Sequence, residues 1–204
     1  MIASTAPKTI KARPRKVPQH LIYEILDGKP VYYKGYREVI QNKKTVEEIM
    51  GASGIQSIII SYLTKWLYSF LDDDLYWLLS NEAGLHLSHR SNLSNDIAIY
   101  ETSVLTPDKI NRKYVDVPPK IVIEIDIDGD VEQMTESGYI YKKTQMMLAF
   151  GTQKVLWVLT AAQVVTVATN DKIETFSWQK DIELMDGHAF NIGQYLDKKG
   201  IVVE

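Results

Sequence analysis

The sequence predicts an α/β protein in which helices flank a mixed central β-sheet. Two observations predict this class. Strand and helix patterns alternate in the middle of the chain, and hairpin patterns lie at both ends. No glycine-rich phosphate loop follows a predicted strand, so a dinucleotide-binding repeat is not indicated. We expect residues 1–18 to be a flexible basic arm and residues 19–204 to form one domain.

A hairpin and a short helix are predicted first. Two alternating runs, 20–25 and 31–33, flank the turn pair Asp27-Gly28 and therefore predict two antiparallel strands. Thr45, followed by Val-Glu-Glu, is typical of a helix N-cap. We therefore expect a short helix to begin at that residue.

The next segment predicts a long helix and then strands. Apolar residues recur at a spacing of 3.6 from Ile55 to Phe70, which predicts an amphipathic helix of about four turns. Shorter apolar runs predict strands over residues 76–79, 84–88 and 96–100.

The second half predicts a strand–helix–strand unit. Residues 121–127 are mostly β-branched and predict a strong strand. A helix is expected over 135–150, with Gly151 as its C-terminal cap. The continuous apolar run 155–159 predicts a central buried strand, and a closing hairpin is expected over 164–178.

Composition excludes several classes of protein. The 204 residues are 45% hydrophobic and 24% charged, which are globular values, and there is no Cys. Disulfide scaffolds, thiolate zinc sites, thiol nucleophiles and iron–sulfur clusters are therefore excluded. No apolar run is long enough to span a membrane and no secretion signal opens the chain. We expect a soluble, cytoplasmic protein.

Charge is unevenly distributed along the chain. Five of the 23 basic residues lie in residues 1–16, which contain no acid, so 18 basic side chains face 26 acidic ones elsewhere. An acidic body is a poor general binder of nucleic acid, but it is compatible with carboxylates that surround a cation. The basic arm is either a solvated tail or, as the alternative, a segment that contacts phosphate.

Acidic side chains interrupt the predicted strands. Glu124 lies inside an apolar strand, and Asp96 begins another. Strand parity places Glu124 and Asp126 on one face. A bare buried carboxylate is costly, and two neighbouring carboxylates repel each other unless a divalent ion lies between them. Hard oxygen ligands without Cys suit Mg²⁺ or Mn²⁺.

The predicted helix after this strand adds a basic group. Lys142 and Lys143 lie where a lysine can reach the strand end. In phosphodiester hydrolysis, carboxylates hold a metal, the metal lowers the pKa of bound water, and a lysine steadies the negative charge. The residues alone leave a structural alternative open, in which Asp96 caps a strand and the pair Glu124 and Asp126 faces solvent.

The order and spacing of these motifs resemble the Uma-two family of restriction endonuclease-like proteins, within the PD-(D/E)XK nuclease superfamily. The likeness covers about residues 20–196. The motifs that carry it are Tyr23-Glu24-Ile-Leu-Asp-Gly, Asn95-Asp96-Ile-Ala-Ile, Pro118-Pro-Lys-Ile-Val-Ile-Glu124-Ile-Asp126, and Lys143 followed by Gly151 and Val155-Leu-Trp-Val-Leu159.

The resemblance implies a restriction-endonuclease-like core and a metal-dependent endonuclease that hydrolyses DNA with Mg²⁺ or Mn²⁺. By position, Asp96 and Glu124 would be metal ligands, and Lys143 would be the catalytic lysine on the helix. Glu24 would be an accessory acid at the same metal. Asp126 stands where a strict motif has lysine, and it would be a further ligand.

The implied partner is DNA, and we expect a homodimer because two copies would cut two strands. One alternative is a catalytically inactive relative that binds nucleic acid or a protein, which Asp126 and the acidic body favour. A second alternative is a structural domain built on the sheet and its aromatic residues.

Overall fold

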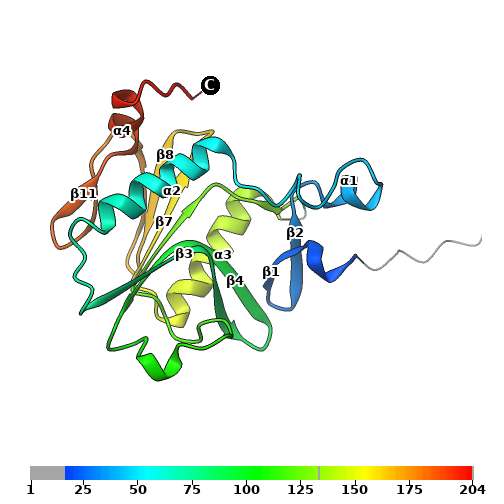
Figure 1. The fold of residues 1–204 in the computed structure, drawn as a ribbon, viewed down its shortest axis with the longest axis horizontal. Coiled ribbons are helices and arrows are strands. Elements are labelled where there is room, and N and C mark those ends of the chain that lie inside the picture. The colour runs from blue at the N-terminus through cyan, green and yellow to red at the C-terminus, as the bar shows by residue number, and fades with distance from the viewer. Residues whose placement is uncertain (1–16, 133, 204) are drawn as a thin grey trace, which may run out of the picture.

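Strands and helices alternate through the described residues, 17–132 and 134–203, of this computed structural model (Figure 1). Residues 1–16 of the expected basic arm lie outside that part. None of the helices described has the length and apolar character needed to cross a membrane. The elements are the 3₁₀ helix η1 (Gln19–Leu21), β1 (Ile22–Leu26), β2 (Lys29–Tyr33), α1 (Tyr36–Ile40), α2 (Gly54–Leu67), β3 (Tyr76–Ser88), β4 (Ser91–Glu101), the 3₁₀ helix η2 (Pro107–Lys109), β5 (Ile121–Ile125), β6 (Gly129–Asp130), α3 (Glu136–Phe150), β7 (Lys154–Leu159), β8 (Val164–Ala168), β9 (Ile173–Ser177), β10 (Ile182–Met185), β11 (His188–Phe190) and α4 (Ile192–Lys198).

A nine-stranded mixed sheet forms the centre of the described residues. Its order is β6-β2-β1-β4-β5-β7-β8-β9, and β3 pairs with β4. β5 and β7 are parallel and joined through α3, whereas the other paired strands of the sheet are antiparallel. The central strands are almost wholly apolar because both of their faces are covered. The predicted mixed sheet, with flanking helices and a hairpin at each end, is confirmed.

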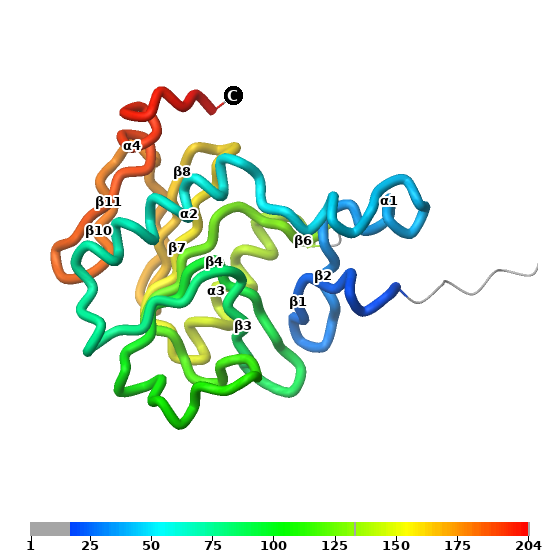
Figure 2. Tube along the Cα trace, in the orientation of Figure 1, coloured from blue at the N-terminus to red at the C-terminus, as the bar shows by residue number. Residues whose placement is uncertain are grey.

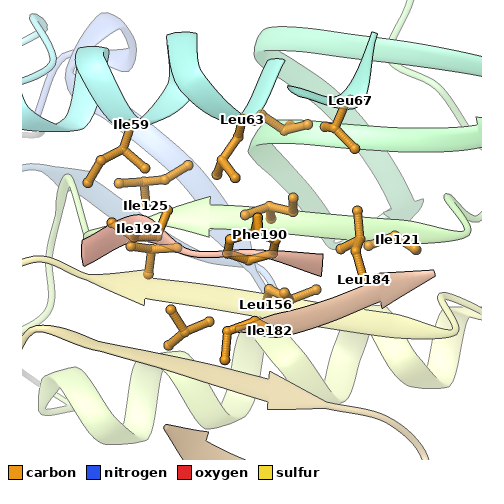
Figure 3. Packing of buried hydrophobic residues seen from close by; sticks show 14 of the residues in the cluster. Ile59, Leu63, Leu67, Ile121, Ile125, Leu156, Ile182, Leu184, Phe190 and Ile192 are labelled. Carbon is orange, nitrogen blue, oxygen red and sulfur yellow. The ribbon is translucent and has the colours of Figure 1, made fainter. Parts of the chain in front are cut away.

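Helices cover the two faces of this sheet differently. α2, α4 and the β10–β11 hairpin pack on one face, and α3 packs on the other (Figures 1 and 2). We call the first the apolar face. It is formed by Ile59, Leu63 and Leu67 of α2, which pack against the isoleucines of β4 and β5 (Figure 3). The second, which we call the α3 face, includes Tyr139 and Trp157.

The two long helices begin within one residue of the predicted starts; α3 also ends as predicted, whereas α2 ends at Leu67, three residues before Phe70. Ser53 caps α2 and forms a capping box with Gln56, because each side chain accepts from the other's backbone N–H. Thr135 caps α3 by accepting from the N–H of Gly138. Gly151 follows α3 with a φ of 120°, a conformation that favours glycine.

The short helix expected at Thr45 is wrong. Thr45 and Glu48 form the paired side-chain contacts of a capping box, but no helix follows them. Gly51 lies three residues after Glu48. A helix that begins at Thr45 and ends before Gly51 has too few turns to stabilise itself. The short helix lies earlier instead, at α1. The β10–β11 hairpin was not predicted either.

The strands expected over 76–79 and 84–88 are the two ends of one strand, β3. Its pairing with β4 shifts between Ser80 and Ala83. Asn81 and Glu82 lie in that interval with φ values of 67° and 56°. Such a bulge bends the strand and directs its side chains differently on each side, which is why the sequence pattern breaks there.

Candidate functional site

Two neighbouring strands bring Asp96 and Glu124 to the same face of the sheet. Ile97 of β4 pairs with Ile123 of β5, so the register continued by one residue places Asp96 opposite Glu124. The two isoleucines point into the apolar face, and the two acids therefore point to the α3 face. The Ile125 N–H donates to Asp96 Oδ2 at 2.7 Å, which fixes that carboxylate against β5.

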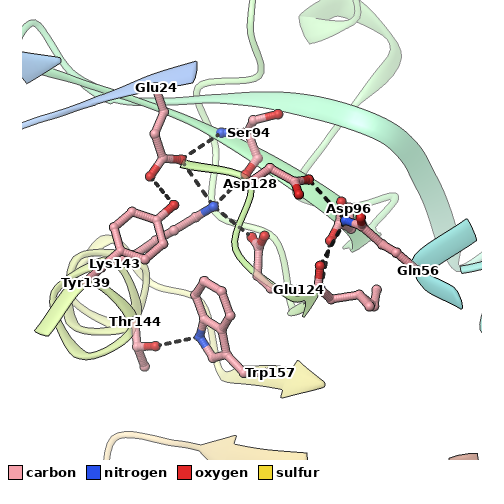
Figure 4. A network of polar contacts seen from close by, with 11 residues as sticks. Glu24, Gln56, Ser94, Asp96, Glu124, Asp128, Tyr139, Lys143, Thr144 and Trp157 are labelled. Atoms are coloured by element: carbon pink, nitrogen blue, oxygen red, sulfur yellow. Dashed lines mark hydrogen bonds and ion pairs between the residues drawn. The ribbon is translucent and has the colours of Figure 1, made fainter. Parts of the chain in front are cut away.

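Helix α3 brings a completely buried lysine to these acids. Lys143 is 0% exposed. Its Nζ lies 3.1 Å from Glu24 Oε2 and 3.2 Å from Glu124 Oε1, and it donates to the Ser94 carbonyl at 2.7 Å (Figure 4). The ammonium is thus held by β1, β4 and β5 at once.

The contact between Lys143 and Glu124 is an ion pair without hydrogen-bond alignment. Glu124 Oε1 is buried and has no hydrogen-bond partner, although the ammonium lies within ion-pair distance. One oxygen of Glu124 can therefore still accept a ligand.

Glu24 is held by a second residue of α3. Tyr139 Oη donates to Glu24 Oε1 at 2.5 Å, and the Ser94 N–H donates to Oε2 at 3.4 Å. Tyr139 was not predicted as a site residue. Its spacing of four from Lys143 places both side chains on one face of the helix, and this spacing is the sequence signal that could have found it.

Asp126 lies apart from this cluster. β5 ends at Ile125, and Asp126 has a left-handed φ of 59°. The expected parity with Glu124 is therefore wrong, because it holds only while the strand continues. Both carboxylate oxygens of Asp126 accept from Thr160, from its N–H and its hydroxyl, each at 2.7 Å. Asp126 joins the end of β5 to the end of β7.

Gln56 is a buried polar residue that was not predicted for the site. Its Nε2 donates to the Ile125 carbonyl at 2.9 Å and to Asp128 Oδ2 at 3.1 Å (Figure 4). The Ser53-x-x-Gln56 pattern of a capping box is visible in the sequence, but the contact with the loop after β5 is tertiary and has no local signal.

The charges of the buried cluster influence one another strongly. Burial by itself would lower the pKa of Lys143, but the carboxylates of Glu124 and Glu24 raise that pKa above the ordinary lysine value. Burial raises the pKa of Glu124, Lys143 opposes the shift, and the nearby Asp96 adds to it. One ammonium is thus shared among several carboxylates.

Asp96 is the carboxylate that Lys143 neutralises least directly. Burial raises its pKa to about 6, although the Ile125 N–H and Lys143 act to lower it. The carboxylates of Asp128 and Glu82 raise it further. A further positive charge next to Asp96 would therefore stabilise its ionised form at neutral pH.

The residues present fit a divalent cation. Three acidic side chains, Glu24, Glu124 and Asp96, share the single ammonium of Lys143. Glu124 Oε1 is buried without a hydrogen bond. Within the described ranges, no group of three or more His, Asp or Glu side chains is arranged to hold a metal ion. A two-carboxylate site still suits Mg²⁺, which keeps several of its waters.

Comparisons with known proteins give a family and a fold. The family model Uma2, described as "Putative restriction endonuclease", matches residues 43–192. A crystal structure described as a putative nuclease belonging to DUF820 from Anabaena variabilis is similar, with a TM-score of 0.62 and 15% identity. The alignment covers 85% of this chain and 89% of that one. No curated protein matched the chain.

Proposed function

This chain belongs to the Uma2 family, described as putative restriction endonuclease, and from that premise we propose that it is a metal-dependent endonuclease that hydrolyses DNA phosphodiester bonds. The family and the nuclease-like fold support a nuclease-type function. The observation that carries the finer proposal is the burial of Lys143 between Glu24 and Glu124, next to Asp96.

Each residue of the cluster has a separate role in this proposal. Asp96 and Glu124 would hold Mg²⁺ or Mn²⁺, which lowers the pKa of bound water and stabilises negative charge on phosphate when it is bound. Lys143, kept charged by its carboxylate neighbours, attracts the scissile phosphate and stabilises the charge that develops on it. Glu24 positions that ammonium, because its own oxygens are already engaged by Tyr139, Ser94 and Lys143.

The test is plasmid cleavage with Mg²⁺ or Mn²⁺ by the wild type and by Asp96→Asn, Glu124→Gln and Lys143→Met. We expect each substitution to lower cleavage by at least about a hundredfold, the scale of lost charge stabilisation at an active site. Asp126→Asn is the matched control, because it changes a carboxylate two residues from Glu124 that is bound to Thr160. We expect it to retain cleavage. Equal cleavage by all variants would remove the proposed site.

A binding domain without catalytic activity is the second candidate. The position of Lys143 favours this candidate, because its ammonium already lies between the carboxylates of Glu24 and Glu124. Calorimetry separates the two candidates, since a nuclease should show Mg²⁺ or Mn²⁺ binding that Asp96→Asn weakens.

We also propose that the protein is a homodimer. Sedimentation should then show a dimer. The first product of plasmid cleavage should be linear rather than nicked, because two copies would cut both strands.

A further inference from the structure

A groove lies between strand β1 and the exposed loop that follows β4. Two adjoining pockets, of about 280 and 460 Å³, share Asn92 and Tyr114 in their walls. Tyr23 and Glu24 line the smaller pocket, and Glu24 is the carboxylate paired with Lys143. His86, Lys113 and Asp116 line the larger one. We call the two together the Tyr114 groove.

Tyr114 is exposed, yet its position is fixed. The side chain is 57% exposed, on the loop that projects between β4 and β5 (Figure 2). The Val115 N–H donates to the Gly84 carbonyl at 3.0 Å, and the His86 N–H donates to the Val115 carbonyl at 2.7 Å. A Cβ on Gly84 would lie 2.6 Å from the Tyr114 ring, so the ring rests directly on this backbone. A ring held in this way loses little freedom when it binds a ligand.

The same loop is locally basic in an acidic protein. Lys109, Arg112 and Lys113 lie within five residues and are exposed, whereas the whole chain has a net charge of −3. At the wall of the groove, His86 Nδ1 lies 2.6 Å from Asn92 Oδ1. This contact occupies the amide oxygen and leaves the amide NH₂ as the donor that can read a base edge. An exposed aromatic ring among basic side chains is typical of surfaces that bind single-stranded nucleic acid.

We propose that the Tyr114 groove binds an unpaired base of the DNA strand, with Tyr114 stacking on the base and Lys113 contacting the neighbouring phosphate. This inference rests on the proposed nuclease function and extends it to the strand that flanks the cut. Glu24 lies in the wall of the groove while its buried carboxylate pairs with Lys143, so a strand held there would pass beside the candidate site. The preferred substrate is therefore DNA with a single-stranded segment.

The test measures binding without hydrolysis. Fluorescence anisotropy of a labelled single-stranded oligodeoxynucleotide is recorded with EDTA for the wild type and its variants. We expect Tyr114→Ala to raise Kd by about tenfold, since stacking on an aromatic ring is worth about 1–3 kcal/mol per base. Tyr114→Phe should bind within about twofold of the wild type. Lys113→Gln should reduce the slope of log K against log salt by about 0.7, the value for one phosphate of a single strand.

Tyr68→Ala is the matched control, because Tyr68 is 59% exposed and follows α2 on the opposite side of the sheet. We expect its Kd to equal that of the wild type.

Three results would each overturn the inference: equal weakening by Tyr68→Ala and Tyr114→Ala, unchanged binding by Tyr114→Ala, or no binding by the wild type. If the wild type binds through Tyr114 but cuts no DNA with any metal, the proposed function fails and the groove stands. If Tyr114→Ala binds and cuts like the wild type, only the groove fails.

Discussion

The central strands β4 and β5 present very different surfaces to the two sides of the sheet. On the apolar face, Ile97 and Ile123 belong to one hydrophobic cluster with Ile59, Leu63 and Leu67 of α2. One residue away on the same strands, Asp96 and Glu124 point to the α3 face, where Lys143 is buried with them. Alternation along a strand therefore places apolar side chains on one side and, on the other, charged side chains within a second hydrophobic cluster.

This difference assigns separate roles to the two faces. The apolar face stabilises the fold, whereas the α3 face holds groups that can take part in a reaction. Apolar burial stabilises the fold by about 25 cal/mol per Å² and needs no partner of a particular charge. Buried charges must be desolvated, and they are tolerated only when each has a partner. The α3 face therefore holds groups whose pKa values are far from ordinary, which is typical of functional sites. Four predictions test this division, in order of expected size.

Lys143→Met should have the largest effect on stability. It leaves Glu24 and Glu124 buried without their cation, and breaking a buried pair in this way costs about 3–5 kcal/mol. Urea unfolding at pH 7 measures the loss. The matched control is Lys142→Met, which removes a surface ion pair with Asp27 and should change the free energy of unfolding little. Equal losses in the two variants would show that the α3 face does not depend on its charges.

Leu63→Ala should lower stability and leave chemistry unchanged. Leu63 is 0% exposed on the apolar face, and truncating a buried leucine costs about 3 kcal/mol. We expect cleavage per folded molecule to equal that of the wild type below the unfolding transition. A fall in specific cleavage comparable to that of Lys143→Met would contradict the functional division between the faces.

Asp96 should make stability depend on pH in a window below neutrality. Its pKa is raised from 3.8 to about 6, so between these values the folded state keeps a proton that the unfolded state has lost. Stability contributed by this group is therefore present below about pH 4 and is lost as pH rises toward about 6. The loss amounts to roughly 2–3 kcal/mol. Asp96→Asn should remove this slope in unfolding curves recorded from pH 4 to 7 without metal, and an unchanged slope would assign it to other groups.

Tyr139→Phe should have the smallest effect. It removes the hydroxyl that donates to Glu24 at 2.5 Å, and a buried hydrogen bond is worth about 1 kcal/mol. On the other side of the sheet, Tyr62 Oη only accepts from the Asn191 N–H at 3.4 Å. Tyr62→Phe should therefore cost less in thermal unfolding. The reverse order would show that Glu24 is held mainly by Lys143.

Most of the fold is predictable because its signals are local. The apolar spacing from Ile55 to Phe70 and the glycine at 151 each mark a helix, and the structure contains both, as α2 and α3. The helix expected at Thr45 fails because the cap is a local signal, whereas continuation of the helix needs packing that this segment lacks.

The candidate site is only partly predictable for the same reason. The order of the motifs predicts Lys143, Glu24 and Glu124 as site residues. The structure brings Lys143 within ion-pair distance of both acids. Asp126 obeys strand parity in the sequence but turns away in the structure, because a backbone with positive φ cannot be read from an acidic residue alone. The contact of Gln56 with the loop after β5 joins segments that are 69 residues apart, and it therefore has no local signal.

The hydrogen bond between Tyr139 and Glu24 also bears on how the chain assembles during synthesis. Its two residues are 115 positions apart, so the first hairpin must wait for α3 before it can dock completely. Contacts this distant in sequence form slowly, since the intervening loop must first be closed. A nascent chain that ends before α3 has Glu24 and Glu124 but lacks Lys143, the residue that pairs with them. The buried charge cluster is therefore absent from growing chains and forms only after α3 has been synthesised.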